Sequence, residues 1–190
     1  MLYLETLSIP WAALYPILTR WEWRGVVERG LFVSGLSGSQ FAHREAAEAL
    51  SRASEDDEGL TLLGACDPAN PYGASSLFPL RHPRSGDFPL RRHPRNFLVV
   101  RAGIPVLAIE GTGERLTPLV DLGPAERRAA LALLPEILRH ESRPRPIRVV
   151  SWDGQPAASS SAAADLESVG FRREDEEFFY YRTYLGSAAS

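Results

Sequence analysis

The stretch RGLFVSGLSGSQFAHREAA, residues 29–47, decides the fold of the N-terminal part of the chain. Its apolar run at residues 30–36 leads into a Gly/Ser turn, a pattern that favours a strand ended by a loop. We expect a helix to open at Gln40-Phe41-Ala42 and to end near residue 53. Upstream, residues 11–27 carry apolar side chains at helical spacing and predict another helix. Helix, Arg-Gly turn and strand in this order are typical of the end of a winged-helix unit, with the strand as the wing.

The sequence after residue 60 predicts a sheet with helices packed on it. Residues 97–101 and 104–110 form a hairpin around a tight Ala102-Gly103 turn. Further strands are expected at 60–66, 116–122, 147–152 and 177–184, and helices at 125–140 and 158–169. Residues 75–95 are rich in proline and arginine and are predicted to be irregular.

These elements predict an α+β fold, a partial winged-helix unit followed by a mostly antiparallel β-sheet with packed helices. We divide the chain into a winged-helix-like unit at residues 1–53, a C-terminal domain at 60–184 and a tail at 185–190. With 190 residues and 44% apolar content, the chain is long enough to bury a core.

Composition argues against several protein classes. No run of about 18 apolar residues is present, so no transmembrane helix is expected. The N-terminus lacks the basic and apolar regions of a secretory signal. A single cysteine, Cys66, leaves no internal disulfide and no cysteine-based zinc site. We therefore expect a cytoplasmic protein without membrane partners or cofactors.

All 21 basic residues are arginine, and the net charge is −3. Arginine suits bidentate contacts to phosphate and base edges, but a GC-rich genome would produce the same bias. The charge distribution says more, because residues 81–101 hold six arginines and two histidines against one acid, Asp87. This segment predicts either phosphate contacts or an exposed loop neutralised by acids elsewhere in the fold. The arginines are Arg81, Arg84, Arg91, Arg92, Arg95 and Arg101.

Aromatic side chains offer a second means of contacting nucleic acid. Trp21 and Trp23 lie on different faces of the N-terminal helix, so we expect one in the core, while the other either stacks on a base or packs on the next domain. Residues 178–181, FFYY, alternate between the core and a face that either stacks on bases or meets a neighbouring domain.

Candidates for catalytic chemistry are few. Asp67, in the turn after a strand, is a weak candidate for a catalytic carboxylate, although an Asx residue before proline usually caps a turn. The four histidines have no metal-ligand spacing. Gly111-Thr112-Gly113 is a turn without the lysine of a phosphate-binding loop, and no Ser/His/Asp arrangement is suggested.

Several blocks, in order along the chain, resemble the C-terminal part of the core of the large helicase-related (Lhr) proteins, DEAD/H-box helicases of superfamily 2. The most specific blocks are RGLFVSG at 29–35 and SGSQFA at 37–42. Weaker blocks are RGVV at 24–27, ACDPAN at 65–70, the hairpin at 96–108, residues 149–154 and LESVGF at 166–171. In the ACDPAN block, Cys66 stands where the family usually has alanine.

The resemblance implies a winged helix and a C-terminal domain that grip single-stranded DNA behind two RecA-like motor domains. This sequence lacks the Walker A lysine, the DEAD/DEAH box and the arginine finger, so we expect no ATPase activity in it. The implied function is a non-catalytic accessory domain, with single-stranded or partly duplex DNA and RecA-like motor domains as partners. The expected contacts are Trp23, three residues of the wing region and five arginines of the segment at 81–101. They are Trp23, Arg29, Ser37, Gln40, Arg81, Arg84, Arg91, Arg92 and Arg95.

The same family resembles bacterial DNA glycosylases built on winged helices, which implies base excision as an alternative, with Asp67 as the candidate carboxylate. A purely structural domain that docks on the motor through its aromatic strand is a third reading. DNA and RNA remain equally open as ligands at this point.

Overall fold

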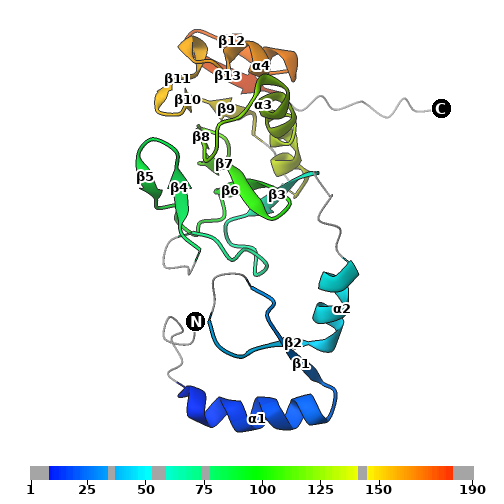
Figure 1. Cartoon of the computed structure of the whole chain (residues 1–190). Helices are drawn as coiled ribbons and strands as arrows, with labels where there is room; N and C mark the ends of the chain where they lie inside the picture. Colours follow the sequence, from blue (N-terminus) through cyan, green and yellow to red (C-terminus); the bar gives the residue numbers. More distant parts are fainter. Residues whose placement is uncertain (1–8, 34–36, 53–58, 74–77, 141–144, 182–190) are drawn as a thin grey trace, which may run out of the picture. The chain divides into compact units, whose positions relative to one another are not determined.

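The computed structural model describes residues 9–33, 37–52, 59–73, 78–140 and 145–181. The chain divides into two compact units, residues 1–56 and 57–190, which Figure 1 colours from blue to red along the sequence. The predicted tail at 185–190 lies outside the described residues, as do residues 53–58. No helix in these ranges has the length and apolar character needed to cross a bilayer.

The N-terminal unit consists of a helix, a two-stranded hairpin and a second helix. The elements are α1 (Trp11–Trp23), β1 (Val27–Gly30), β2 (Gln40–His43) and α2 (Arg44–Arg52). The strands β1 and β2 pair antiparallel, with Val27 opposite His43 and Gly30 opposite Gln40. The rings of Trp11 and Tyr15 on α1 pack against Phe41 on β2, with centroids 6.3 and 6.1 Å from it.

The structure corrects three boundaries in this unit. The helix expected at 11–27 ends at Trp23, and Val27 begins β1. The strand expected at 30–36 lies earlier, at Val27–Gly30, and residues 34–36 are outside the described ranges. Gln40-Phe41-Ala42 do not open the helix but form β2, and α2 begins at Arg44. Pairing with β1 buries part of Phe41 against α1, and this tertiary contact outweighs the helical pattern of the sequence.

The C-terminal unit is built on a six-stranded sheet in the order β11-β10-β8-β7-β6-β3. All neighbours pair antiparallel except β8 and β10, which are parallel. Its strands are β3 (Leu60–Gly64), β6 (Phe97–Arg101), β7 (Ile104–Glu110), β8 (Arg115–Pro118), β10 (Ser151–Trp152) and β11 (Gln155–Pro156). The hairpin of β6 and β7 matches the expected ranges and confirms the pattern read from the sequence.

A second sheet in this unit has the order β12-β13-β9. Its strands are β9 (Ile147–Val149), β12 (Arg172–Glu174) and β13 (Glu177–Tyr180). The strand expected at 147–152 is therefore divided at Val150, with β9 in one sheet and β10 in the other. Of the strand expected at 177–184, residues 182–184 lie outside the described ranges.

Helices and short 3₁₀ segments complete the unit. They are α3 (Pro124–Leu131), η2 (Leu134–His140), η3 (Ala157–Ser159) and α4 (Ala163–Ser168). The helix expected at 125–140 changes to a 3₁₀ segment around Pro135, because proline removes a donor from the helical ladder. The helix expected at 158–169 is likewise shorter, and it ends before Gly170, whose φ is +97°.

The two faces of the six-stranded sheet bury different cores. Val99 and Ile109 face the larger core, where α3, η2, α4 and the second sheet supply the covering side chains. Leu98 and Ala108, one residue earlier in each strand, face a smaller core with Leu80 and Leu90. This alternation follows the two-residue period of strands and leaves both faces of the hairpin covered.

Part of the segment predicted to be irregular is ordered. Residues 75–95 contain β4 (Leu80–His82) and β5 (Gly86–Phe88), which pair antiparallel as a small hairpin. Leu80 and His82 point inward between exposed arginines, and this two-residue alternation is obscured in the sequence by the surrounding prolines.

Candidate nucleic-acid interface

Arg29 is held inside the N-terminal unit. Its guanidinium donates to Glu22 Oε2 at 2.5 Å and to the Tyr15 hydroxyl at 3.1 Å. The guanidinium carbon also lies 5.4 Å from the Tyr15 ring centroid and 5.0 Å from that of Phe41. The hydrogen bond to Glu22 raises the pKa of Arg29. Arg29 thus joins α1 to the hairpin, and this anchoring role is one that the sequence reasoning did not foresee.

Gln40 closes the wing loop that follows β1. Its Oε1 accepts hydrogen bonds from the backbone N–H groups of Phe32 and Val33, at 2.9 and 2.8 Å. Its Nε2 donates to the Val33 carbonyl at 3.0 Å. The amide therefore shapes the loop, while Ser37 is exposed on it.

Two large apolar side chains of this unit are almost fully exposed. Trp23 at the end of α1 and Leu31 in the wing loop are each 85% exposed, whereas Trp21 is 43% exposed. Single exposed apolar side chains are common on protein surfaces, so exposure alone does not make either residue a binding site. Neither tryptophan is in a core, contrary to the expectation that one of them would be buried.

The arginines of the C-terminal unit are for the most part paired with local acids. Arg81 lies 3.7 Å from Asp87, Arg95 lies 3.5 Å from Glu114, and Arg84 and Arg101 make ion pairs with Asp153 and Glu126. Arg92 donates to the Asn70 carbonyl at 2.7 Å. Arg91 is exposed, and its side chain has no polar partner within the described part of the chain.

His82 links the β4–β5 hairpin to the turn between β10 and β11 by hydrogen bonds. Nδ1 of His82 accepts from the Ser85 N–H at 3.0 Å, so its Nε2 carries the proton and donates to Asp153 Oδ1 at 2.7 Å. The Ser85 hydroxyl lies 2.8 Å from the same Nδ1. This is a Ser/His/Asp chain that the sequence did not suggest, because Asp153 is 71 residues from His82.

The geometry of that chain favours anchoring over nucleophilic catalysis. A general base needs its nitrogen lone pair for the serine proton, and here the Ser85 backbone N–H already occupies it. His82 is 8% exposed, so its two hydrogen bonds replace those that burial removes. The contact positions the hairpin that carries Arg81 and Arg84.

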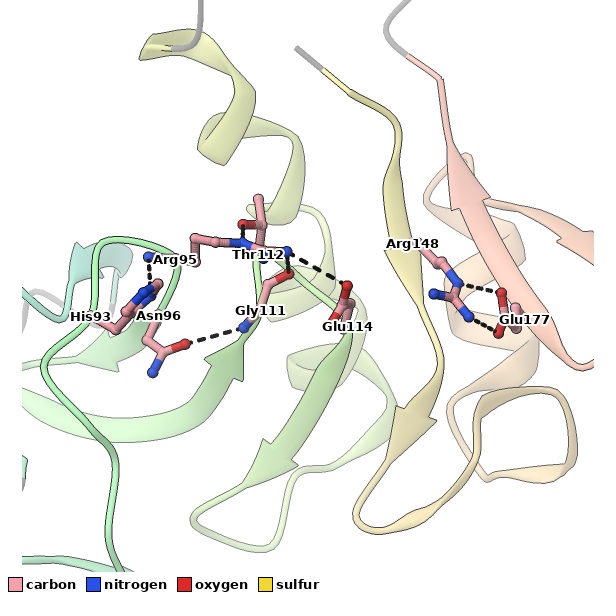
Figure 2. A network of polar contacts seen from close by, with 8 residues as sticks. All are labelled: His93, Arg95, Asn96, Gly111, Thr112, Glu114, Arg148 and Glu177. Carbon is pink, nitrogen blue, oxygen red and sulfur yellow. Dashed lines mark hydrogen bonds and ion pairs between the residues drawn. The ribbon is translucent and has the colours of Figure 1, made fainter.

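A second polar network surrounds the turn between β7 and β8 (Figure 2). Arg95 donates to Thr112 Oγ1 and to the Gly111 carbonyl, both at 3.0 Å, and the Asn96 side chain accepts from the Gly111 N–H at 3.1 Å. These contacts hold Thr112 at φ +63°, which is rare for a β-branched residue. Arg95 therefore stabilises the turn and is also an exposed cation.

Figure 2 also shows the side-by-side ion pair of Arg148 on β9 with Glu177 on β13. Hydrogen bonding to Arg148 lowers the pKa of Glu177, and the same bond raises the pKa of Arg148. Among the described residues no group of three or more His, Cys, Asp or Glu side chains is arranged to hold a metal ion.

Comparison with known proteins gives a match for the N-terminal unit. Residues 1–61 match the family model described as the winged-helix domain of large helicase-related protein. The similarity to the large helicase-related (Lhr) proteins is thus found in these residues of the N-terminal unit. The assignment accords with the helix, hairpin and wing loop of the unit, and it confirms the resemblance carried by the RGLFVSG and SGSQFA blocks.

A curated Lhr relative comes from Mycolicibacterium smegmatis and is described as an "Lhr helicase/ probable uracil glycosylase". It is 36% identical over 74 residues, which cover 36% of this chain and 5% of the relative. The chain thus matches a small part of a much longer Lhr protein.

Asp67, the weak candidate for a catalytic carboxylate, caps a turn. Its Oδ1 accepts from the Ala69 N–H at 2.8 Å, and the buried Asn70 binds the carbonyls of Gly64 and Ala65 at 3.3 Å. In both residues the side-chain Oδ1 accepts from the backbone N–H two residues further on, as the Asx-turn pattern predicts.

Proposed function

We propose that this chain is a nucleic-acid-binding accessory module of an Lhr-type helicase that grips single-stranded DNA through its backbone. The match of residues 1–61 to the Lhr winged-helix domain carries the proposal. The partners would be single-stranded or partly duplex DNA and RecA-like motor domains in the same or another chain.

The arrangement of charges supports contacts without sequence preference. Arg81, Arg84, Arg91 and Arg92 are exposed on or beside the β4–β5 hairpin. Phosphate oxygens can compete with the weak surface pair of Arg81 with Asp87. Such contacts release counterions and make affinity fall steeply with salt. Exposed Trp23 adds a ring on which any base can stack.

Fluorescence anisotropy with labelled single-stranded and duplex oligonucleotides tests this proposal directly. We expect the chain to bind at about 50 mM salt and the affinity to fall linearly on a log–log plot. Arg91→Gln combined with Arg92→Gln should reduce the slope by about 1.4, since each phosphate contact to a single strand contributes about 0.7.

The matched control replaces Arg172 and Arg173, which are exposed on β12, by glutamine. It removes the same charge from a different place and should leave most of the slope intact. Absence of binding by the wild-type chain at low salt would refute the proposed function, and equal slope changes in the two double variants would refute the arginine segment as the contact.

A second candidate function is base excision, favoured by the printed description of the mycobacterial relative as a probable uracil glycosylase. Hydrolysis of a glycosidic bond calls for a positioned carboxylate and a pocket for a flipped base. Asp67 is exposed but committed to its turn. If it acts, Asp67→Asn should abolish abasic-site formation in uracil-containing DNA while preserving much of the turn, and abasic sites formed at the wild-type rate would exclude it.

A further inference from the structure

The C-terminal end of α1 combines two arginines with an exposed tryptophan, and the arginine segment at residues 81–101 has no tryptophan. Arg20 and Trp23 belong to α1, and Arg24 is the C-cap residue that follows it with a right-handed helical backbone. All three are exposed, and the spacing i, i+3, i+4 places them on one face. We propose that this face binds one unpaired base and the phosphates on either side of it, with the indole stacked on the base. The inference rests on the proposed function and assigns it to a specific surface.

The two arginines differ from the other three of the N-terminal unit because they have no acidic partner among the described residues. Arg29, Arg44 and Arg52 pair with Glu22, Glu28 and Glu48. Arg20 and Arg24 make no side-chain hydrogen bond or ion pair to any described residue. Two guanidinium groups without carboxylates, one turn apart, form a site complementary to phosphate.

The acid nearest in sequence points away from this face. At about 100° per residue, Glu22 lies roughly opposite Arg20 around the helix. There it binds Arg29 of β1, on the side where Tyr15 also meets the hairpin. The ion pair of Glu22 with Arg29 therefore leaves the outward face of α1 cationic.

Trp23 is free to stack because its ring is not used in packing. The rings of Trp11 and Tyr15 contact each other and Phe41, whereas Trp23 is 85% exposed and makes no ring contact within the described part of the unit. An indole flanked by arginines favours nucleic acid over an apolar protein surface, since a buried protein interface would leave both charges unpaired.

The test uses the full chain and oligo(dT), followed by anisotropy and by tryptophan fluorescence. Trp23→Ala should weaken binding about tenfold, whereas Trp23→Phe should keep much of the affinity but lose most of the fluorescence quenching that stacking causes. Arg20→Gln with Arg24→Gln should reduce the salt slope by about 1.4, and the double lysine variant should retain the slope.

Controls separate this inference from the proposed function. The Arg172→Gln/Arg173→Gln variant should bind like the wild type, and circular dichroism should show unchanged folding in every variant, because each altered side chain is exposed. If the wild type binds oligo(dT) and the Trp23 and Arg20/Arg24 variants bind equally well, the inference is wrong and the proposed function stands. If the wild type does not bind, both are wrong.

Discussion

Replacing Asp165 by alanine is expected to lower the free energy of unfolding by about 3 kcal/mol, because it leaves a buried arginine without its counterion. Asp165 on α4 is 5% exposed and binds Arg127 and Arg128 of α3, at 2.5 and 3.1 Å. The side chain of Arg127 is only 16% exposed, so water cannot fully replace the lost carboxylate. Chemical denaturation followed by circular dichroism measures the change.

Glu167 on the same helix provides the control for Asp165. It is exposed, so Glu167→Ala should change the free energy of unfolding by less than about 0.5 kcal/mol. A loss below about 1 kcal/mol for Asp165→Ala would show that the contact between α3 and α4 depends on apolar packing alone.

Substitution of Gly113 by alanine is expected to destabilise the C-terminal unit by about 3 kcal/mol or more, from steric overlap and backbone strain together. A Cβ at this position would lie 2.4 Å from Cγ2 of Ile147, and φ is +107°. Ile147 is fully buried in the larger core, so it has little room to move. Thermal and chemical unfolding of the variant give the size of the effect.

Gly103 separates the two causes. Its φ is +77°, but a Cβ there would have no neighbour within 4 Å. Gly103→Ala should therefore show the conformational cost alone, about 1 kcal/mol. Equal losses at the two glycines would contradict the steric explanation for Gly113.

The sequence was sufficient where local patterns and tertiary contacts agree. The β6–β7 hairpin has two continuous apolar strands and an Ala-Gly turn whose two residues both have positive φ, so its ranges could be predicted to the residue. The similarity of residues 1–61 to the Lhr winged-helix domain could likewise be predicted from the RGLFVSG and SGSQFA blocks.

Prediction failed where pairing across the chain decides the conformation. Phe41 is a strand residue because it packs on Tyr15 of α1, and no local signal reveals that contact. The β4–β5 hairpin depends on His82, whose partner Asp153 comes from a turn far along the chain. For the candidate site, the sequence pointed to Trp23 and the basic segment. It did not indicate which of the arginines would be paired with acidic side chains, since ion pairing depends on the tertiary fold.

The division of one extended segment between two sheets has a mechanical consequence. Val150 separates β9 from β10, and its N–H donates to the Glu114 carbonyl at the start of β8. Separation of β13 from β9 would pull on β10 only two residues away, and the parallel contact with β8 would have to give as well. The two sheets are therefore expected to unfold together, as one cooperative unit.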